Sequence, residues 1–275
     1  MSRFLSPARL LLGAASLALV TAAPASHVAA QASTSPPDFQ NAWLAMGGEF
    51  KEIPGATPTP TRQDSRYRYV PNNTSEQPTY RIGDTSNPNF KPWVVEAMNK
   101  DNQEVLAGKY AYTARSSCAH AGVPGFMGFG AQPIYFVQTP KEVLMIFQGD
   151  AQVRHVHMNV EHSANPKLSW YGESVGHYEG DTLVVDTIGL NNKTFLDAYR
   201  TPHSDKLHVT ERWKKSEDGE LKVLITIADP EAFNQPFQVM QRYNRVPQTL
   251  VEQVCAENNG YFFGARVPMA DKADF

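Results

Sequence analysis

The stretch that decides the fold runs from Ser169 to Trp213 and reads SWYGESVGHYEGDTLVVDTIGLNNKTFLDAYRTPHSDKLHVTERW. Two runs rich in β-branched and apolar residues meet at Gly180-Asp181, a pair of residues typical of a tight hairpin turn. A polar loop follows, and the run KLHVTERW then has the pattern of another strand. The stretch therefore predicts a β-hairpin, a loop and a third strand, with polar side chains gathered near the strand ends.

The register of this hairpin follows from its turn. A two-residue turn at Gly180-Asp181 places Glu179 opposite Thr182 and, two steps further, Val175 opposite Asp186. Because side chains alternate along a strand, one face carries His177, Val184, Asp186 and Ile188, and the other carries Tyr178, Leu183, Val185 and Thr187. The second face is the more apolar, which makes it the better candidate for packing. A diagonal His177–Asp186 pair is within reach, and the alternative is that both side chains face solvent.

From Pro133 onward the chain is a series of short apolar runs broken by turn residues. We expect about nine strands, at 134–139, 142–148, 151–159, 173–179, 182–190, 206–215, 220–228, 237–244 and 249–257. Strands at such regular spacing predict a mainly β fold, an antiparallel meander that closes into a barrel or forms a sandwich. Closure also removes exposed sheet edges. One short helix is expected between Pro92 and Gly108, residues that suit the start and the end of a helix.

The first 32 residues have the pattern of a secretory signal peptide. Arg3 and Arg9 precede the apolar run Leu10–Val20, and small residues follow, with cleavage expected after Ala30 or Ala32. The apolar run is too short to cross a bilayer as a helix, although an uncleaved anchor is the alternative. We therefore expect a secreted or periplasmic protein that does not remain in the membrane after signal cleavage.

The rest of the chain divides into two parts in this interpretation. Residues 33–92 form an irregular segment rich in Pro, Thr, Asn and Ser, with a first strand near Ala42–Met46, and residues 93–275 form the barrel domain. The irregular segment is expected to wrap the surface and to cover a sheet edge or the mouth of a pocket.

Composition restricts the classes of partner. The chain has 275 residues, of which 41% are hydrophobic, as in a globular protein, and its net charge of −3 indicates neither nucleic acid nor an anionic membrane surface as a partner. Cys118 and Cys255 are the two cysteines. An even count in an oxidising compartment favours a disulfide, and two free buried thiols are the alternative.

A possible metal motif lies in the strand before the hairpin. His155 and His157 share one face of that strand, with Arg154, Val156 and Met158 on the other. Together with Gly149 and Glu161, the two histidines resemble the first metal-binding motif of cupin barrels, which bind a divalent metal. The second cupin motif is not found in GDTLVVDTIGLNN. A cupin-like, metal-dependent enzyme that uses His155, His157 and Glu161 is therefore an alternative reading.

The loop after the hairpin is dense in groups that can transfer protons, namely Asp197, His203, Ser204, Asp205, His208 and Glu211. Asp197 or Glu211 could orient His203 and adjust its pKa toward neutrality for acid–base work. Glu211 shares a face with Val209 and Trp213, and an apolar environment favours the protonated, acid form of a carboxyl group. The alternatives are an ordinary polar turn around His203 and a surface ion pair for Glu211. No nucleophile elbow accompanies Ser204, which disfavours serine hydrolysis.

Several segments together resemble a widespread family of uncharacterised exported bacterial proteins, namely DFQNAW (38–43), CAHAGVPGFM (118–127), QPIYFVQTPKEVLMIFQ (132–148), GHYEGDTLVVDTIGL (176–190), KTFLDAYRTPHSDKLHVTERW (193–213), DPEAF (229–233) and EQVCAEN (252–258). The resemblance implies a lipocalin-like (calycin-like) β-barrel, although Asn41 stands where the Gly-x-Trp motif of lipocalins has glycine. Cys118 and Cys255 match cysteines of the family, which fits a disulfide. The family's recurring polar positions correspond to His162, Asp186, Asp197, His203 and Glu211.

These observations lead to one predicted function and two alternatives. The prediction is an exported small-molecule enzyme of lyase, hydratase, isomerase or cyclase type, which uses cofactor-free acid–base chemistry on an apolar or aromatic molecule held in the barrel mouth. His203, oriented by Asp197, is the leading acid or base, and His162 and Glu211 are candidates for the opposite role. Asp186 completes the predicted site. The alternatives are a non-catalytic lipocalin-like ligand carrier and the cupin-like metal enzyme.

Overall fold

The computed structural model describes residues 35–69, 81–108, 118–128 and 132–254, together with the two-residue strands β11 (Tyr261–Phe262) and β12 (Ala265–Arg266). The predicted signal peptide lies outside these residues. So does Cys255, so the predicted Cys118–Cys255 disulfide remains a prediction. No helix within the described residues has the length and apolar character needed to cross a membrane.

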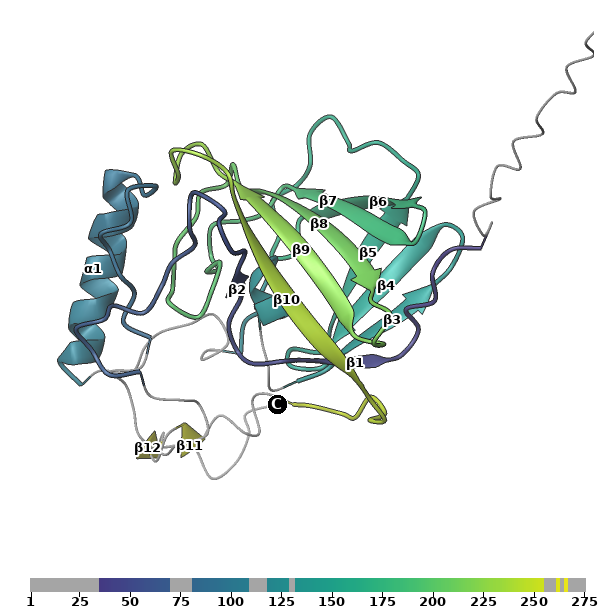
Figure 1. The fold of residues 1–275 in the computed structure, drawn as a ribbon, viewed down its shortest axis with the longest axis horizontal. Helices are drawn as coiled ribbons and strands as arrows, with labels where there is room; N and C mark the ends of the chain where they lie inside the picture. The colour runs from purple at the N-terminus through teal and green to yellow at the C-terminus, as the bar shows by residue number, and fades with distance from the viewer. Residues whose placement is uncertain are drawn as a thin grey trace, which may run out of the picture. The chain divides into compact units, whose positions relative to one another are not determined.

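Ten strands of the described chain form a single β-sheet that curls into a barrel (Figure 1). Its strands are β1 (Ala42–Ala45), β2 (Lys51–Glu52), β3 (Ile134–Gln138), β4 (Glu142–Phe147), β5 (Gln152–Met158), β6 (Glu173–Glu179), β7 (Thr182–Ile188), β8 (His208–Lys215), β9 (Leu221–Ala228) and β10 (Phe237–Val246). The predicted mainly β fold with a closed barrel is confirmed.

The barrel closes where β1 pairs with β10. The strand order is β1-β3-β4-β5-β6-β7-β8-β9-β10, and β1 also pairs with β10, so nine strands form the ring and β2 pairs with β10 beside β1. All neighbours are antiparallel except β5 and β6, which run parallel. The meander expected from the sequence is therefore interrupted once, where residues 159–172 carry the chain back along the barrel before β6 begins.

The predicted hairpin register is confirmed. Glu179 lies opposite Thr182, His177 opposite Val184, and Val175 opposite Asp186. The predicted faces are confirmed as well, since Leu183, Val185 and Thr187 are buried and Asp186 is only half-buried. Along β5 the same alternation buries Arg154, Val156 and Met158 and leaves His155 and His157 exposed.

Large side chains fill the interior of the barrel. The ring centroid of the fully buried Trp213 lies 5.2 Å from that of Phe136 and 5.5 Å from that of Tyr243. Trp43 and Phe147 are also fully buried. A barrel of about eight strands is just wide enough for its own side chains to occupy the interior. The barrel interior is therefore packed core, which leaves its outer face and its mouth for contact with another molecule.

The predicted helix is also confirmed. Helix α1 spans Pro92–Leu106, with proline in its first turn, and it buries Val94, Met98, Asn102 and Val105 along one stripe. The Asn102 side chain donates to Gly83 O and accepts from Gly83 N, at 2.8 and 3.2 Å. A side chain at position 83 would lie 2.6 Å from Met98, so glycine allows this close approach.

The expected strand near residue 250 turns out differently, whereas the irregular N-terminal segment covers a sheet edge as expected. Residues 249–254 of the predicted strand 249–257 are irregular, with Leu250 and Val251 about half exposed. β1 occupies the free edge of β10 that this strand would have needed. In the irregular segment, β2 covers part of the same edge, and Pro60 and Thr61 line a small cavity at the barrel mouth.

Candidate functional site on the outer face of the barrel

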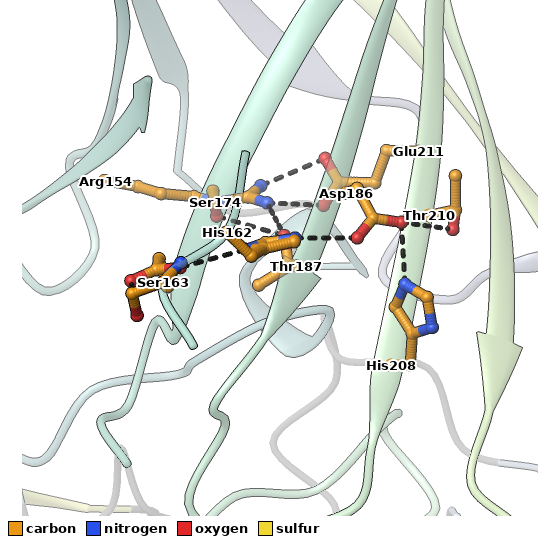
Figure 2. A network of polar contacts seen from close by, with 10 residues as sticks. Arg154, His162, Ser163, Ser174, Asp186, Thr187, His208, Thr210 and Glu211 are labelled. Carbon is orange, nitrogen blue, oxygen red and sulfur yellow. Dashed lines mark hydrogen bonds and ion pairs between the residues drawn. The ribbon is translucent and has the colours of Figure 1, made fainter. Parts of the chain in front are cut away.

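Two polar networks lie back to back on strands β6, β7 and β8, one inside the barrel and one outside it (Figure 2). The inner network centres on Glu211, whose carboxylate receives two hydrogen bonds from Arg154, at 2.7 and 3.0 Å, and one from Trp213 Nε1, at 2.8 Å. Arg154 also donates to Ser174 and Thr187, at 3.0 and 2.7 Å. The pair is almost completely buried, with side-chain exposures of 1% for Arg154 and 0% for Glu211.

The inner network shows that Glu211 is buried and does not form the surface ion pair that was the alternative. Its expected face is correct, since Val209, Glu211 and Trp213 all point into the barrel. Its partner is Arg154, which lies on β5 and not among the neighbouring surface cations. Because both carboxylate oxygens are already bonded inside the core, Glu211 offers no contact to a substrate in this structure. Its role here is to balance the buried charge of Arg154.

The outer network centres on Asp186, whose carboxylate is shared by two imidazoles. His162 Nε2 lies 2.8 Å from Asp186 Oδ1, and His208 Nε2 lies 2.6 Å from Asp186 Oδ2. The Thr210 hydroxyl donates to Asp186 Oδ2 at 3.1 Å. His208 and Thr210 belong to β8 and Asp186 to β7, which are neighbouring strands with Asp186 opposite Thr210. Strand alternation therefore brings these side chains onto one outer surface.

His162 reaches this surface from the segment between β5 and β6. Its other ring nitrogen, Nδ1, lies 3.1 Å from Glu173 Oε1 at the start of β6. Glu173 also accepts from the backbone N–H and the hydroxyl of Ser163, both at 2.7 Å. His162 thus lies between two carboxylates, and Glu173, the first residue of β6, bonds to both His162 and Ser163 of the loop.

The charges of this network shift the ionisation of its members. Burial favours the protonated form of Asp186, but hydrogen bonds from His208 and His162 outweigh it and lower the pKa of this carboxyl group to about 2. The hydrogen bond to Asp186 raises the pKa of His208 above its ordinary value. Hydrogen bonds from Ser163 lower the pKa of Glu173. The two carboxylates are therefore charged at neutral pH, and His208 holds its proton more firmly than a free histidine.

His203 and Asp197, the pair expected to lead the chemistry, are held by other partners. His203 Nδ1 donates to the carbonyl of Ser204 at 2.8 Å, and His203 Nε2 lies 2.8 Å from the Thr194 hydroxyl. Burial lowers the pKa of His203, which favours a neutral ring that accepts from Thr194. The expected orientation of His203 by Asp197 is therefore wrong, since the loop itself fixes the imidazole.

Asp197 organises the turn that follows it. Its carboxylate accepts from the backbone N–H groups of Tyr199 and Thr201, at 2.9 and 3.2 Å, and from the Thr201 hydroxyl, at 2.7 Å. Burial raises the pKa of Asp197 in spite of these bonds. Asp197 and Tyr199 line the cavity at the barrel mouth, together with Glu49, but its free volume is only about 20 Å³. This is room for about one water molecule.

The residues of the cupin-like alternative do not form the expected group. His155 and His157 approach the same carboxylate, Glu142 on β4, at 2.6 and 3.7 Å. Glu161 lies in the loop after β5, three positions beyond Met158, and is exposed. Within the described part of the chain, no three His, Cys, Asp or Glu side chains are arranged to hold a metal ion. The diagonal partner considered for Asp186 is also different, since His177 Nε2 lies 3.1 Å from Glu179.

The structure thus brings together two of the five predicted site residues, His162 and Asp186, and adds His208 and Glu173. Sequence reasoning missed His208 as a site residue, although period-two alternation places it with Thr210 on the same side as Asp186. The contact of His162 with Asp186 depends on the crossover between the parallel strands β5 and β6, which no local sequence pattern predicts. Searches against models of protein families, curated proteins and solved structures found no match to this chain.

Proposed function

We propose that the chain is an exported small-molecule enzyme of lyase or isomerase type. In this proposal His208 transfers a proton to or from the substrate, and Asp186 orients the His208 ring. The observation that carries the proposal is the shared carboxylate, with imidazole nitrogens 2.8 and 2.6 Å from its two oxygens. A carboxylate that holds one nitrogen of an imidazole fixes the ring and stabilises its protonated form, which is the basis of many acid–base sites. The proposal needs no cofactor.

His208 suits the role because one of its nitrogens remains available. Its Nε2 is bonded to Asp186, and its Nδ1 has no hydrogen-bond partner among the described residues. The side chain is 46% exposed, so a bound molecule can reach the ring. The raised pKa of His208 keeps the imidazolium present closer to neutral pH, where it can donate a proton and then take it back.

His162 and Glu173 complete the site electrostatically. Both ring nitrogens of His162 face carboxylates, so this imidazole is committed to the protein and serves as a positioning residue. Its contact with Asp186 Oδ1 leaves Oδ2 as the oxygen that holds His208 and Thr210. The arrangement defines one orientation of the Asp186 carboxylate and one orientation of the His208 ring.

The substrate class and the location rest on other observations. Val160 and Leu168, in the segment that carries His162, are 53% and 54% exposed, which offers apolar contacts to an apolar or aromatic molecule near the site. Export follows from the predicted signal peptide, and it agrees with the resemblance to a family of exported barrels. A lipocalin-like carrier receives less support because side chains fill the barrel interior.

Proton abstraction from 5-nitrobenzisoxazole, a small aromatic probe that releases a coloured phenolate, tests the proposal. We expect turnover above that of an equal concentration of free imidazole, with a rate that rises as His208 loses its proton. His208→Gln should lower the rate by about 100-fold, the usual scale of a general acid–base residue. His177→Gln is the matched control, because His177 is also an exposed histidine paired with a carboxylate on the same sheet.

Two outcomes would contradict the proposal. One is a wild-type rate no greater than that of free imidazole, and the other is a His208→Gln variant as active as the wild type. The metal-dependent alternative is tested separately, by metal analysis of protein purified without added metal and by the effect of His155→Gln on the same rate.

A further inference from the structure

The segment that joins the two parallel strands, residues 159–172, is here named the crossover strap. Its ends are fixed by backbone hydrogen bonds, from Asn159 N to Gly176 O at 2.7 Å and from Ser169 N to Gly189 O at 2.9 Å. Between them, residues 160–168 are mostly exposed. Within those nine positions only His162 and Ser163 make hydrogen bonds to the barrel. These two adjacent residues therefore supply the hydrogen bonds that hold the middle of the strap, and Pro166 lies against Gly189.

The geometry around His162 restricts its protonation. Nδ1 faces Glu173 Oε1 at 3.1 Å, and Nε2 faces Asp186 Oδ1 at 2.8 Å, on two different strands. An ionised carboxylate only accepts hydrogen bonds, and a neutral imidazole has only one N–H to donate. If the ring were neutral, one of its lone pairs would face a carboxylate oxygen. Both contacts are hydrogen bonds only when the ring carries both protons.

We propose that His162 is a proton-dependent latch, which holds the crossover strap against β6 and β7 as an imidazolium and releases it when the ring loses a proton. The latch does not depend on the catalytic role proposed for His208. Its release would uncover Asp186 Oδ1 and separate residues 160–168 from the outer face of the barrel. Exposed segments with few contacts open at low free-energy cost, so loss of one anchor is enough to change the population of the open strap.

The groups that surround His162 decide the direction of the switch. Glu173 comes from β6, Asp186 from β7, and His208 reaches the same Asp186 carboxylate from β8. Both carboxylates remain ionised across neutral pH, because the pKa of Asp186 is about 2 and that of Glu173 is lowered by Ser163. In the proposed latch, rising pH therefore opens the strap by removing a ring proton of His162. Only strong acid would remove the negative charges of the two carboxylates. The hydrogen bonds of Ser163 to Glu173 form the second anchor, which breaks whenever the strap opens and re-forms when it closes.

Two measurements on the full chain test the latch. Nitrogen NMR of the histidine side chains reports whether one or both ring nitrogens of His162 carry hydrogen, and we expect both at pH 6. Hydrogen exchange of the Ser163 amide, which donates to Glu173 Oε1 in the closed strap, reports the opening of the strap once it is corrected for the intrinsic effect of pH. We expect His162→Gln to speed this exchange by about tenfold at pH 6, the loss of a charge-assisted hydrogen bond. In the wild type the corrected exchange should rise toward that of the variant as pH increases.

His177→Gln is the control, because it removes an exposed histidine–carboxylate pair from the same sheet and leaves the strap untouched. Glu173→Gln is a second variant, which keeps the imidazole but leaves Asp186 as the one carboxylate that His162 faces, so a singly protonated ring can satisfy both contacts. A singly protonated His162 at pH 6 would overturn the proposal. So would strap exchange that is equal in the wild type and in His162→Gln, with His177→Gln confirming that the barrel is intact.

Discussion

The two faces of strands β6, β7 and β8 carry networks of similar composition that differ in exposure. On the inside, Glu211 and Arg154 are bonded to each other and to polar neighbours, with essentially no contact with solvent. On the outside, Asp186 holds two imidazoles whose side chains are 20% and 46% exposed. The buried pair has no atom free for another molecule, whereas an exposed imidazole held by a carboxylate can exchange a proton with a bound molecule. The inner network therefore serves stability, and the outer network is the one suited to chemistry.

The largest effect should follow from breaking the inner network. Glu211→Ala leaves the Arg154 guanidinium buried and without its carboxylate, which should lower the free energy of unfolding by about 3–5 kcal/mol. Urea unfolding followed by tryptophan fluorescence measures the change. The double variant Arg154→Met with Glu211→Leu removes both charges, so it should be markedly more stable than Glu211→Ala. A loss below about 1 kcal/mol in the single variant would contradict this view of the core.

A smaller effect should follow from Asp186→Asn on the outer face. The lowered pKa of Asp186 means that its ionised form stabilises the folded state, by roughly 1–2 kcal/mol once solvent screening of this partly exposed group is allowed for. The stabilisation is complete above the unfolded-state pKa of about 4 and is lost as pH falls toward 2. Unfolding curves between pH 6 and pH 2 should therefore be steeper in pH for the wild type than for Asp186→Asn. Equal slopes would show that Asp186 is not stabilised in the folded protein.

His208→Gln should have a still smaller effect on stability, below about 1 kcal/mol, because the pair is largely exposed. Its pH dependence has the opposite sign. A raised pKa in the folded state stabilises the protein below the unfolded-state value of about 6.5, and this contribution is lost as pH rises through the folded-state pKa. The variant should therefore lose less stability than the wild type between pH 6 and pH 9. Parallel curves would contradict the assigned hydrogen bond between His208 and Asp186.

The smallest effect is expected for His177→Gln. His177 and Glu179 are both about half exposed, and such surface pairs contribute within about 0.5 kcal/mol. Thermal unfolding should detect almost no change. If this variant proved as costly as Asp186→Asn, exposure would not be what separates the two kinds of pair.

Much of the site could be predicted from local pattern. The turn at Gly180-Asp181 specified the register that places Val175 opposite Asp186, and alternation put Glu211 on one face with Val209 and Trp213 and Asp186 on the less apolar face of its strand. The partners of these carboxylates could not be predicted in the same way. Arg154 and Glu211 are 57 positions apart, and His162 and Asp186 are 24 apart, so their meeting depends on the closure of the barrel and on the crossover strap.

The sequence by itself determined the elements of this protein, because turn residues and period-two alternation act over a few positions and leave little choice of face. It thereby determined a mainly β fold with one helix and which residues share a face of each strand. Only the tertiary structure decided that β5 and β6 run parallel and that β1 closes the ring by pairing with β10. Only it decided that His208, and not His203, shares a carboxylate with His162. Such pairings depend on how strands that are far apart in the sequence pack around a filled core. Local patterns extend over only a few residues and therefore cannot specify them.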